Sequence, residues 1–304
     1  MPELLVAHES GPGGLSPRDR LVRSLCTLFL LVGTGVLALT IAYLCREAGL
    51  GSDFFRRSLD CFTAEWKPLA TPPQLGLAHA WASTFLVTGI AMALSLPFGF
   101  GIGLFVAELA PPALRRLLSP ALELLAGIPA VVYGFFGAVT LVRWFEHLFQ
   151  LPSGETLLGA GIVLAVMMLP FIASTSGEAF RAVYAEYREG VLALGVDQFT
   201  MFRRVILIRA LPGLIAAAAL GLARGVGETL AVLMLSGNTT AFPGSVLSRG
   251  QPLTALLATE IGETAVHSDK YRMLFTGALF LMLMVLALNF AVSLMKRSTQ
   301  RLYV

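Results

Sequence analysis

The chain has 304 residues, of which 56% are hydrophobic and 13% are charged, and its mean hydropathy is +0.76. Soluble domains carry roughly 25% charged residues, so this composition excludes a soluble globular protein and indicates an integral membrane protein. The net charge of +3 is small and the basic residues are spread over short loops, which argues against a nucleic-acid partner. The three cysteines, Cys26, Cys45 and Cys61, lack the spacing of a disulfide framework or a metal site.

The first 80 residues predict a tail, one span and a loop. Residues 1–20 are rich in Gly, Pro, Ser and charge without apolar periodicity, which predicts a disordered cytoplasmic tail. Residues 21–45 form an apolar run as long as a bilayer is thick, with arginines before it and no small-x-small cleavage site after it. We therefore expect an uncleaved first transmembrane helix with its amino terminus inside, followed by an external loop over residues 46–80.

Residues 81–304 predict a core with five further transmembrane helices. The second span covers residues 81–107 and contains Gly99, Gly101 and Gly103, which allow close helix contact in lipid. The third covers residues 118–145, where Pro129 removes a backbone donor and is expected to kink the helix, either for packing alone or also to shape a substrate path. The fourth ends at residues 169–170.

A polar segment over residues 175–209, which we call the knob, interrupts the apolar runs. Apolar residues recur at three- and four-residue steps over residues 176–194, with charges on the other faces, which predicts an amphipathic helix separate from the fourth span. Gly195 suits the left-handed position that ends a helix, and Asp197 suits the amino cap of the next one. We expect two short helices that meet at Gly195 on the cytoplasmic side.

The fifth span is expected over residues 211–235, and the sixth ends near residue 295. Between them lies an external segment, residues 236–272, whose apolar part at residues 253–261 is able to dip into the membrane. Basic residues at the tail, after the second span, in the knob and at the carboxyl end predict six spans with both termini in the cytoplasm, although the first external loop is also basic. The histidines His79, His147 and His267 are separated in sequence and predict surface residues rather than metal ligands.

The fifth span carries two ionisable residues, Arg224 and Glu228. Each costs roughly 2.5–3.5 kcal/mol in hydrocarbon, so such residues face a protein-lined or watery path by default. Residues four apart lie on the same face of a helix, so we expect Glu228 to hold the Arg224 guanidinium while the path is empty. The alternative is a permanent bridge that fixes helix packing or pairs with another subunit.

The sequence contains no phosphate-binding loop, no zinc-protease motif, no paired cysteines and no nucleophile elbow. We therefore expect a transport subunit rather than an enzyme, with no cofactor and no metal, and with energy supplied by a partner at the knob.

Two motifs carry a resemblance to a known family. Residues 188–195, Arg-Glu-Gly-Val-Leu-Ala-Leu-Gly, followed by Arg203 and Arg204, resemble the EAA loop of ABC importer permeases. Residues 221–229, Gly-Leu-Ala-Arg-Gly-Val-Gly-Glu-Thr, with Ser-Gly-Asn-Thr at 236–239, are similar to the phosphate-specific permeases, nearer to the PstC type than to PstA. The chain departs from the loop at Gly190 and Val191, where Ala-Ala is usual, and at Ile208, where Pro is usual.

The resemblance implies an all-α, multi-pass protein of the cell inner membrane with the type I ABC importer permease fold and six transmembrane helices. It implies three kinds of protein partner: a PstA-like sister permease, two PstB-like ATPase subunits and a PstS-like extracytoplasmic phosphate-binding protein. The residues expected to couple to the ATPase are Arg188, Glu189, Gly195 and Asp197. Those expected along the substrate path are Arg224, Glu228, Thr229, Tyr133 and Asn238.

Two other function classes stay open. An importer for another oxyanion, molybdate or tungstate, shares the knob and differs in the path. A stand-alone secondary transporter or channel that uses Arg224 and Glu228 does not need the knob. A membrane enzyme has the least support, because the sequence shows no catalytic constellation.

Overall fold

The computed structural model describes residues 17–301 apart from 50, 52–53 and 64. The predicted disordered tail lies outside the described residues up to residue 16, and residues 17–20 already belong to the first helix. In chain order the elements are α1 (Pro17–Ala48), α2 (Phe54–Thr63), β1 (Trp66–Lys67), β2 (Gln74–Leu75), α3 (Ala78–Leu104), η1 (Phe105–Leu109), α4 (Pro112–Gly127), α5 (Ala130–Phe149), α6 (Leu157–Ala193), α7 (Gln198–Met201), η2 (Phe202–Ile206), α8 (Leu207–Val226), α9 (Leu230–Leu235), α10 (Leu253–Glu260), η3 (Ile261–Glu263) and α11 (Asp269–Arg301).

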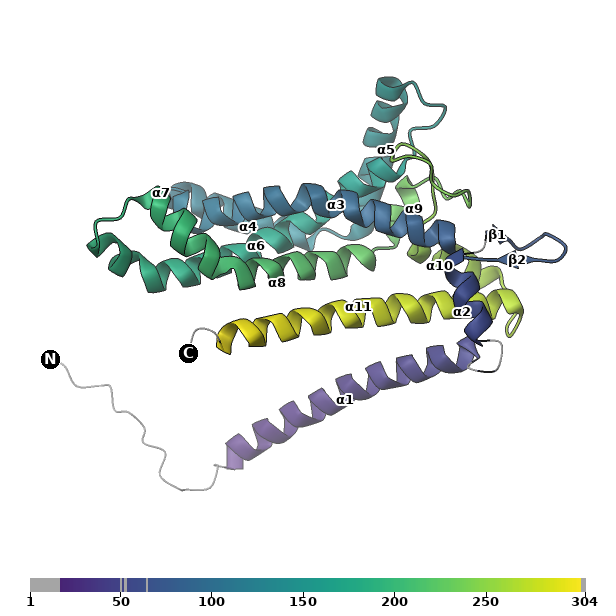
Figure 1. Cartoon of the computed structure of the whole chain (residues 1–304), viewed down its shortest axis with the longest axis horizontal. Helices are drawn as coiled ribbons and strands as arrows, with labels where there is room; N and C mark the ends of the chain where they lie inside the picture. The colour runs from purple at the N-terminus through teal and green to yellow at the C-terminus, as the bar shows by residue number, and fades with distance from the viewer. Residues whose placement is uncertain (1–16, 50, 52–53, 64, 302–304) are drawn as a thin grey trace.

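The long helices run along one axis of the molecule (Figure 1). Helix α7 lies at one end, which we call the knob end, and the antiparallel hairpin of β1 and β2 lies at the other, which we call the hairpin end (Figure 1). Five helices are long and apolar enough to cross a membrane, and the bent pair of α4 and α5 makes a sixth if it counts as one span. The expected helical membrane protein is confirmed, and its six spans are confirmed when α4 and α5 together count as one span.

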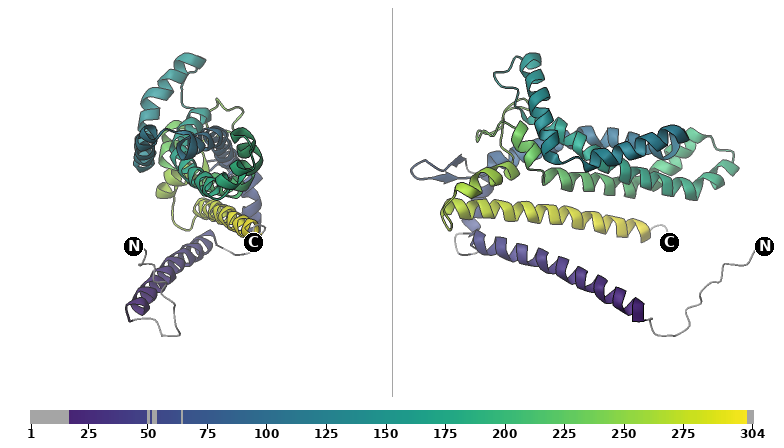
Figure 2. Two further views of the ribbon diagram at one scale, coloured as in Figure 1. Left: turned by 90° about the vertical axis from the view of Figure 1, so that its left-hand side faces the viewer. Right: turned by 180° about the vertical axis from the view of Figure 1, so that it is seen from behind.

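The third span is broken rather than kinked. Helices α4 and α5 meet at 91°, and α5 stands away from the long axis of the bundle (Figures 1 and 2). Ile128 is extended, with ψ of 128°, because a residue before proline avoids the helical region. Pro129 then begins the new direction without an N–H to pair. The hydroxyl of Tyr133 donates a hydrogen bond across the break to the Leu125 carbonyl at 2.8 Å.

The fourth span and the amphipathic part of the knob are one helix. Helix α6 continues through Pro170 and ends at Ala193, so the predicted end at residue 170 was wrong. Packing against α3 accounts for a helix that continues through an internal proline. A Cβ on Gly161 would lie 2.7 Å from Ile90 Cγ2, and a Cβ on Gly103 would lie 2.7 Å from the Ala173 carbonyl oxygen. Close contact with α3 on both sides of Pro170 favours one continuous α6, which local propensity does not foresee.

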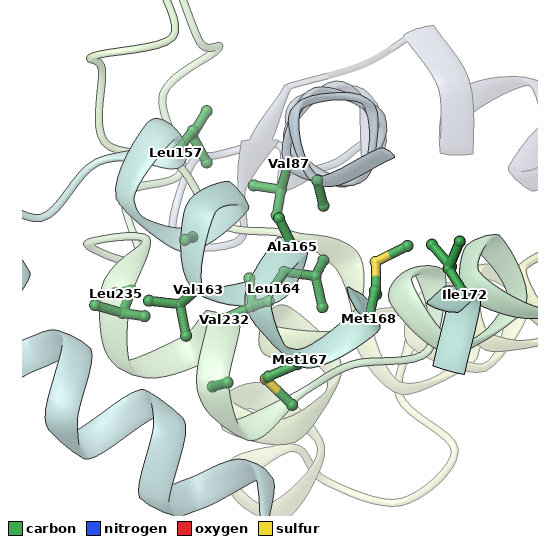
Figure 3. Close-up of a cluster of buried hydrophobic side chains, with 13 residues drawn as sticks. Val87, Leu157, Val163, Leu164, Ala165, Met167, Met168, Ile172, Val232 and Leu235 are labelled. Carbon is green, nitrogen blue, oxygen red and sulfur yellow. The ribbon is translucent and has the colours of Figure 1, made fainter. Parts of the chain in front are cut away.

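The main core lies where α3, α6 and α9 meet. Figure 3 shows Val87 of α3 and Val232 and Leu235 of α9 around a row of α6 side chains. Lipid tails are as apolar as these side chains, so the cluster stabilises the fold through tight packing rather than through removal from water. It fixes α9, and with it the break that precedes α9, against the longest helix of the bundle.

A second core closes the hairpin end. Helix α10 lies between α3 and α11, and its Leu253 and Leu256 are fully buried. The apolar segment expected at residues 253–261 is thus a packed helix. His79 is also buried here, at 3% exposed, so the expectation of a surface histidine was wrong at this position.

Candidate functional site

Gly195 and Asp197 build the turn of the knob. The φ of Gly195 is +73°, and its N–H donates to the Leu192 carbonyl at 3.0 Å, so α6 ends in a left-handed turn. Asp197 caps α7, because its Oδ2 accepts a hydrogen bond from the Thr200 N–H at 3.0 Å. Hydrogen bonding by the side chain and backbone of Thr200 holds the pKa of the Asp197 carboxyl below its usual value, so this cap stays ionised. Both local predictions for this turn are confirmed.

The knob has a packed face and an exposed face. Phe180, Met201 and Ile206 pack with Ala107 of η1 in a third buried cluster, which joins the knob to the end of α3. On the other face, Leu194 is 80% exposed and Phe199 is 71% exposed. Arg188 and Glu189 are exposed on the last turns of α6. The exposed face of the knob thus combines apolar and charged side chains.

Gly195 and Gly190 make a matched pair for a test of the turn. A Cβ on either residue meets nothing within 4 Å, but only Gly195 has a positive φ. We expect Gly195→Ala to cost about 1 kcal/mol or more, because an L side chain is strained in the left-handed region. Gly190→Ala lies inside α6 and is expected to stabilise by up to about 1 kcal/mol. Thermal unfolding of the purified variants shows whether each substitution raises or lowers stability. Equal effects on stability would show that the turn does not depend on Gly195.

Arg224 lies in the last turn of α8 with its charge unneutralised. Its guanidinium carbon is 4.4 Å from the centre of the Phe171 ring on α6, and its Nε is buried without a hydrogen-bond partner. Within the described part of the chain, no carboxylate comes within ion-pair distance of Arg224. Stacking on an aromatic ring is worth about 2 kcal/mol when desolvated. That stabilisation is smaller than the roughly 2.5–3.5 kcal/mol that a charge costs inside a membrane. An anion beside Arg224 would therefore be stabilised.

Glu228 does not pair with Arg224, because the helix that was expected to carry both is broken. Helix α8 ends at Val226, and residues 227–229 separate it from α9. The Glu228 Oε1 instead accepts a hydrogen bond from the Ala231 N–H at 3.4 Å. Its carbonyl accepts a hydrogen bond from the Thr254 hydroxyl of α10 at 2.7 Å. The predictions of a continuous fifth span and of a shared helix face for Arg224 and Glu228 were therefore wrong. Gly227 supplies the weak point, and side chains satisfy the backbone groups that the break frees.

The other predicted path residues bond to the backbone near helix ends. Thr229 Oγ1 donates to the Gly227 carbonyl at 3.4 Å within the break. Asn238 has a φ of 45°, and its Nδ2 donates to the Leu233 carbonyl at 2.8 Å, just beyond α9. Tyr133 spans the α4–α5 break as described above. Helix α5 packs on α9 so closely that a Cβ on Gly134 would lie 2.9 Å from the Ala231 Cα, so the two breaks belong to one packed unit.

Sequence reasoning missed Phe171 and Thr254. Phe171 follows Pro170 in an apolar run, and Thr254 begins a helix far along the chain, so neither stands out from its neighbours. Their contacts arise only when α6, α8 and α10 come together. Among the residues that the structure describes, no group of three metal-ligating side chains comes together.

Comparison with known proteins places this geometry in a family. Residues 99–302 match the model of the binding-protein-dependent transport system inner membrane component. The probable ABC transporter permease protein YqgH of Bacillus subtilis is 32% identical over 271 residues, 88% of this chain and 86% of that protein. The phosphate transport system permease protein PstC of Xylella fastidiosa is 31% identical over an alignment of 322 residues, gaps included. The alignment covers 97% of this chain and 95% of that protein.

Solved structures agree on the fold. The MetNI methionine ABC transporter in an inward-facing conformation matches 71% of this chain and 93% of its own, with a TM-score of 0.54 at 20% identity. A bacterial ABC transporter involved in the import of alginate matches 93% of this chain and 96% of its own, with a TM-score of 0.62 at 11% identity. The permease fold of ABC importers expected from the sequence is thus confirmed. With a family model over two thirds of its length and full-length relatives above 30% identity, the chain belongs to the binding-protein-dependent transport system inner membrane components.

Proposed function

We propose that this chain is the membrane-spanning permease subunit of an ATP-driven importer of inorganic phosphate, and that Arg224 contacts the anion as it passes. The observation that carries the proposal is the Arg224 guanidinium, which stacks on Phe171 without a neighbouring carboxylate among the described residues. A permanently charged planar fork suits a phosphate oxyanion in a bidentate arrangement. The names of the PstC relatives support phosphate over molybdate or tungstate.

The two helix breaks give the path its shape in this proposal. Glu228 and Thr229 hold the break after α8, and Tyr133 holds the break before α5, so that Arg224 stays at a fixed depth. Asn238 ends α9 beyond them. Broken helices are tolerated in membranes where they are buried in protein or line a cavity, which is the setting expected for a substrate path.

The knob is the proposed contact with the ATPase. The exposed Arg188 and Glu189, the Gly195 turn and the Asp197 cap form a stable surface beside the apolar Leu194 and Phe199. In this proposal the knob faces the cytoplasm, both termini lie on that side, and two ATPase subunits of the PstB type drive the rocking of this chain against a PstA-like sister permease. A PstS-like binding protein delivers phosphate at the hairpin end.

Reconstitution tests the assignment directly. Vesicles that contain this chain, its sister permease, the ATPase and a phosphate-loaded binding protein are expected to accumulate phosphate only with ATP. Excess molybdate or tungstate is expected to leave uptake unchanged. Strong competition by either anion would mean that this anion, rather than phosphate, is the substrate. Uptake without the ATPase would favour a secondary transporter or channel.

Glu189 offers a test of coupling. We expect Glu189→Gln to assemble normally and to lower transport-coupled ATP hydrolysis by on the order of tenfold, because a hydrogen bond to a charged group is worth roughly 1.5–3 kcal/mol. Glu186→Gln, an exposed glutamate one turn earlier on α6, is the matched control and is expected to have little effect. Binding-protein-stimulated ATPase activity is the measurement. Equal activity of the two variants would remove Glu189 from the coupling surface.

A further inference from the structure

A cavity of about 480 Å³ lies at the hairpin end, between α2, β2 and the first turn of α11. We call it the arginine cavity, because Arg56, Arg57 and Arg272 line it, together with Asp60 and Asp269. It lies at the opposite end of the bundle from the knob and contains none of the residues assigned to the phosphate path (Figure 1). It is therefore a separate site from the one proposed around Arg224.

Two of the arginines converge on one turn of the backbone. Arg57 donates from Nη1 to the Ala48 carbonyl at 3.0 Å and from Nη2 to the Gly49 carbonyl at 2.8 Å, so it caps the end of α1. A Cβ on Gly49 would lie 3.6 Å from Arg57 Nη2 and 3.8 Å from Arg272 Cδ. Helix α2 and the start of α11 thus bring two arginine side chains together over Gly49, just beyond the end of α1.

The charge balance of the cavity favours an anion. Three guanidinium groups face two carboxylates, and Arg56 and Arg272 are exposed. Over the described ranges, 17–301 with their gaps, neither of these two arginines forms an ion pair within 4 Å. The planar fork of arginine binds phosphate oxygens two at a time, and a cavity with more than one such fork offers several charge-assisted hydrogen bonds to one oxyanion.

The cavity lies at the ends of two candidate membrane spans. One span covers Arg20–Ala48 and the other covers Asp269–Ala291, so Ala48 and Asp269 end the two apolar helices on the same side. Helix α1 packs along α11 near this end and diverges from it toward the knob end (Figure 2). The most apolar stretch of α1, which the structure describes in full, contains no buried residue. A bound headgroup would bridge α2 and α11 beside the end of α1, the least enclosed span.

We propose that the arginine cavity binds a phosphate oxyanion, carried by an anionic phospholipid headgroup or by free inorganic phosphate. Arg56 and Arg272 contact the oxyanion, and Arg57 contributes its fixed charge while it caps α1. Basic pockets between transmembrane helices bind phosphorylated headgroups through the same chemistry.

Site-resolved arginine modification tests the proposal. The full-length chain, in its assembled complex, is placed in nanodiscs of phosphatidylcholine alone, of phosphatidylcholine with phosphatidylglycerol, or of phosphatidylcholine with added inorganic phosphate. Phenylglyoxal modification of Arg56 and Arg272 is then followed by peptide mass spectrometry. We expect modification on the order of tenfold slower either with phosphatidylglycerol or with inorganic phosphate than in phosphatidylcholine alone, because a bound oxyanion occupies the guanidinium N–H groups. The protected sample identifies the source of the oxyanion.

Variants give a second, independent readout. Arg56→Gln with Arg272→Gln is expected to lose the phosphatidylglycerol or phosphate that native mass spectrometry finds on the wild type. Lys67→Gln with Arg143→Gln removes the same number of charges outside the cavity and is expected to retain it. Equal modification rates in all three nanodiscs would overturn the proposal, even if the double variant failed to fold. Protection only after addition of a binding protein would also overturn it, in favour of a protein contact.

Discussion

Replacing Arg224 with Gln is expected to abolish phosphate uptake while the complex still assembles. The variant keeps a polar side chain but loses the permanent charge that stacks on Phe171. In the pair that Arg224 is proposed to form with passing phosphate, loss of one charged partner costs roughly 2–5 kcal/mol, which slows transport about thirtyfold or more. Arg224→Lys keeps the charge without the planar fork and is expected to retain partial activity. Initial rates of ATP-dependent phosphate uptake into proteoliposomes give the measurement.

The control for this variant is Arg116→Gln on α4. Arg116 is exposed, and its Nε bonds to the nearby Pro112 carbonyl at 3.3 Å, so its loss removes one charge without touching the path. Uptake by this control is expected to stay near the wild-type rate. If Arg224→Gln lost the sister permease or the ATPase on purification, the charge would belong to helix packing, and its role with the anion would be withdrawn.

Replacing Gly103 with Leu is expected to prevent assembly of a stable protein. A Cβ on Gly103 would lie 2.7 Å from the Ala173 carbonyl oxygen and 3.0 Å from the Gly177 nitrogen, and it would also overlap Ser176 Oγ. These are mostly backbone atoms of α6, which cannot move aside as a flexible side chain does. Overpacking of this kind costs about 1–3 kcal/mol for a small group and more for a leucine, and it separates the pair of helices at the centre of the bundle.

Gly101 provides a matched control on the same helix. It lies two residues from Gly103 and is exposed, and a Cβ added to it would meet no atom within 4 Å. Gly101→Leu is expected to leave the yield of monodisperse protein unchanged or slightly higher, since leucine favours helix over glycine. Size-exclusion chromatography and thermal unfolding of both variants provide the test. Similar yields for the two would show that α3 and α6 do not need a bare backbone at their crossing.

Local signals in the sequence were sufficient for the membrane class, the span count and the turn of the knob. A run of apolar residues long enough to cross a bilayer is recognisable without knowing its neighbours. Gly195 and Asp197 are likewise read from their own positions, because a left-handed turn and an amino cap involve residues only a few positions away. The motif around Arg224 pointed to the family for the same reason, since it is contiguous.

The tertiary structure decided which helices are broken and which charges have partners. Pro170 lies inside a continuous helix, whereas the chain breaks at Pro129 and again at Gly227, although each position carries a helix-breaking residue. Neighbouring helices determine the outcome, because they either hold the helix in line or satisfy the backbone groups that a break frees, as Thr254 does for Glu228. The same packing separates Glu228 from Arg224 and brings Phe171 to the guanidinium instead. No spacing rule predicts these contacts, since they join residues that meet only after the helices have packed.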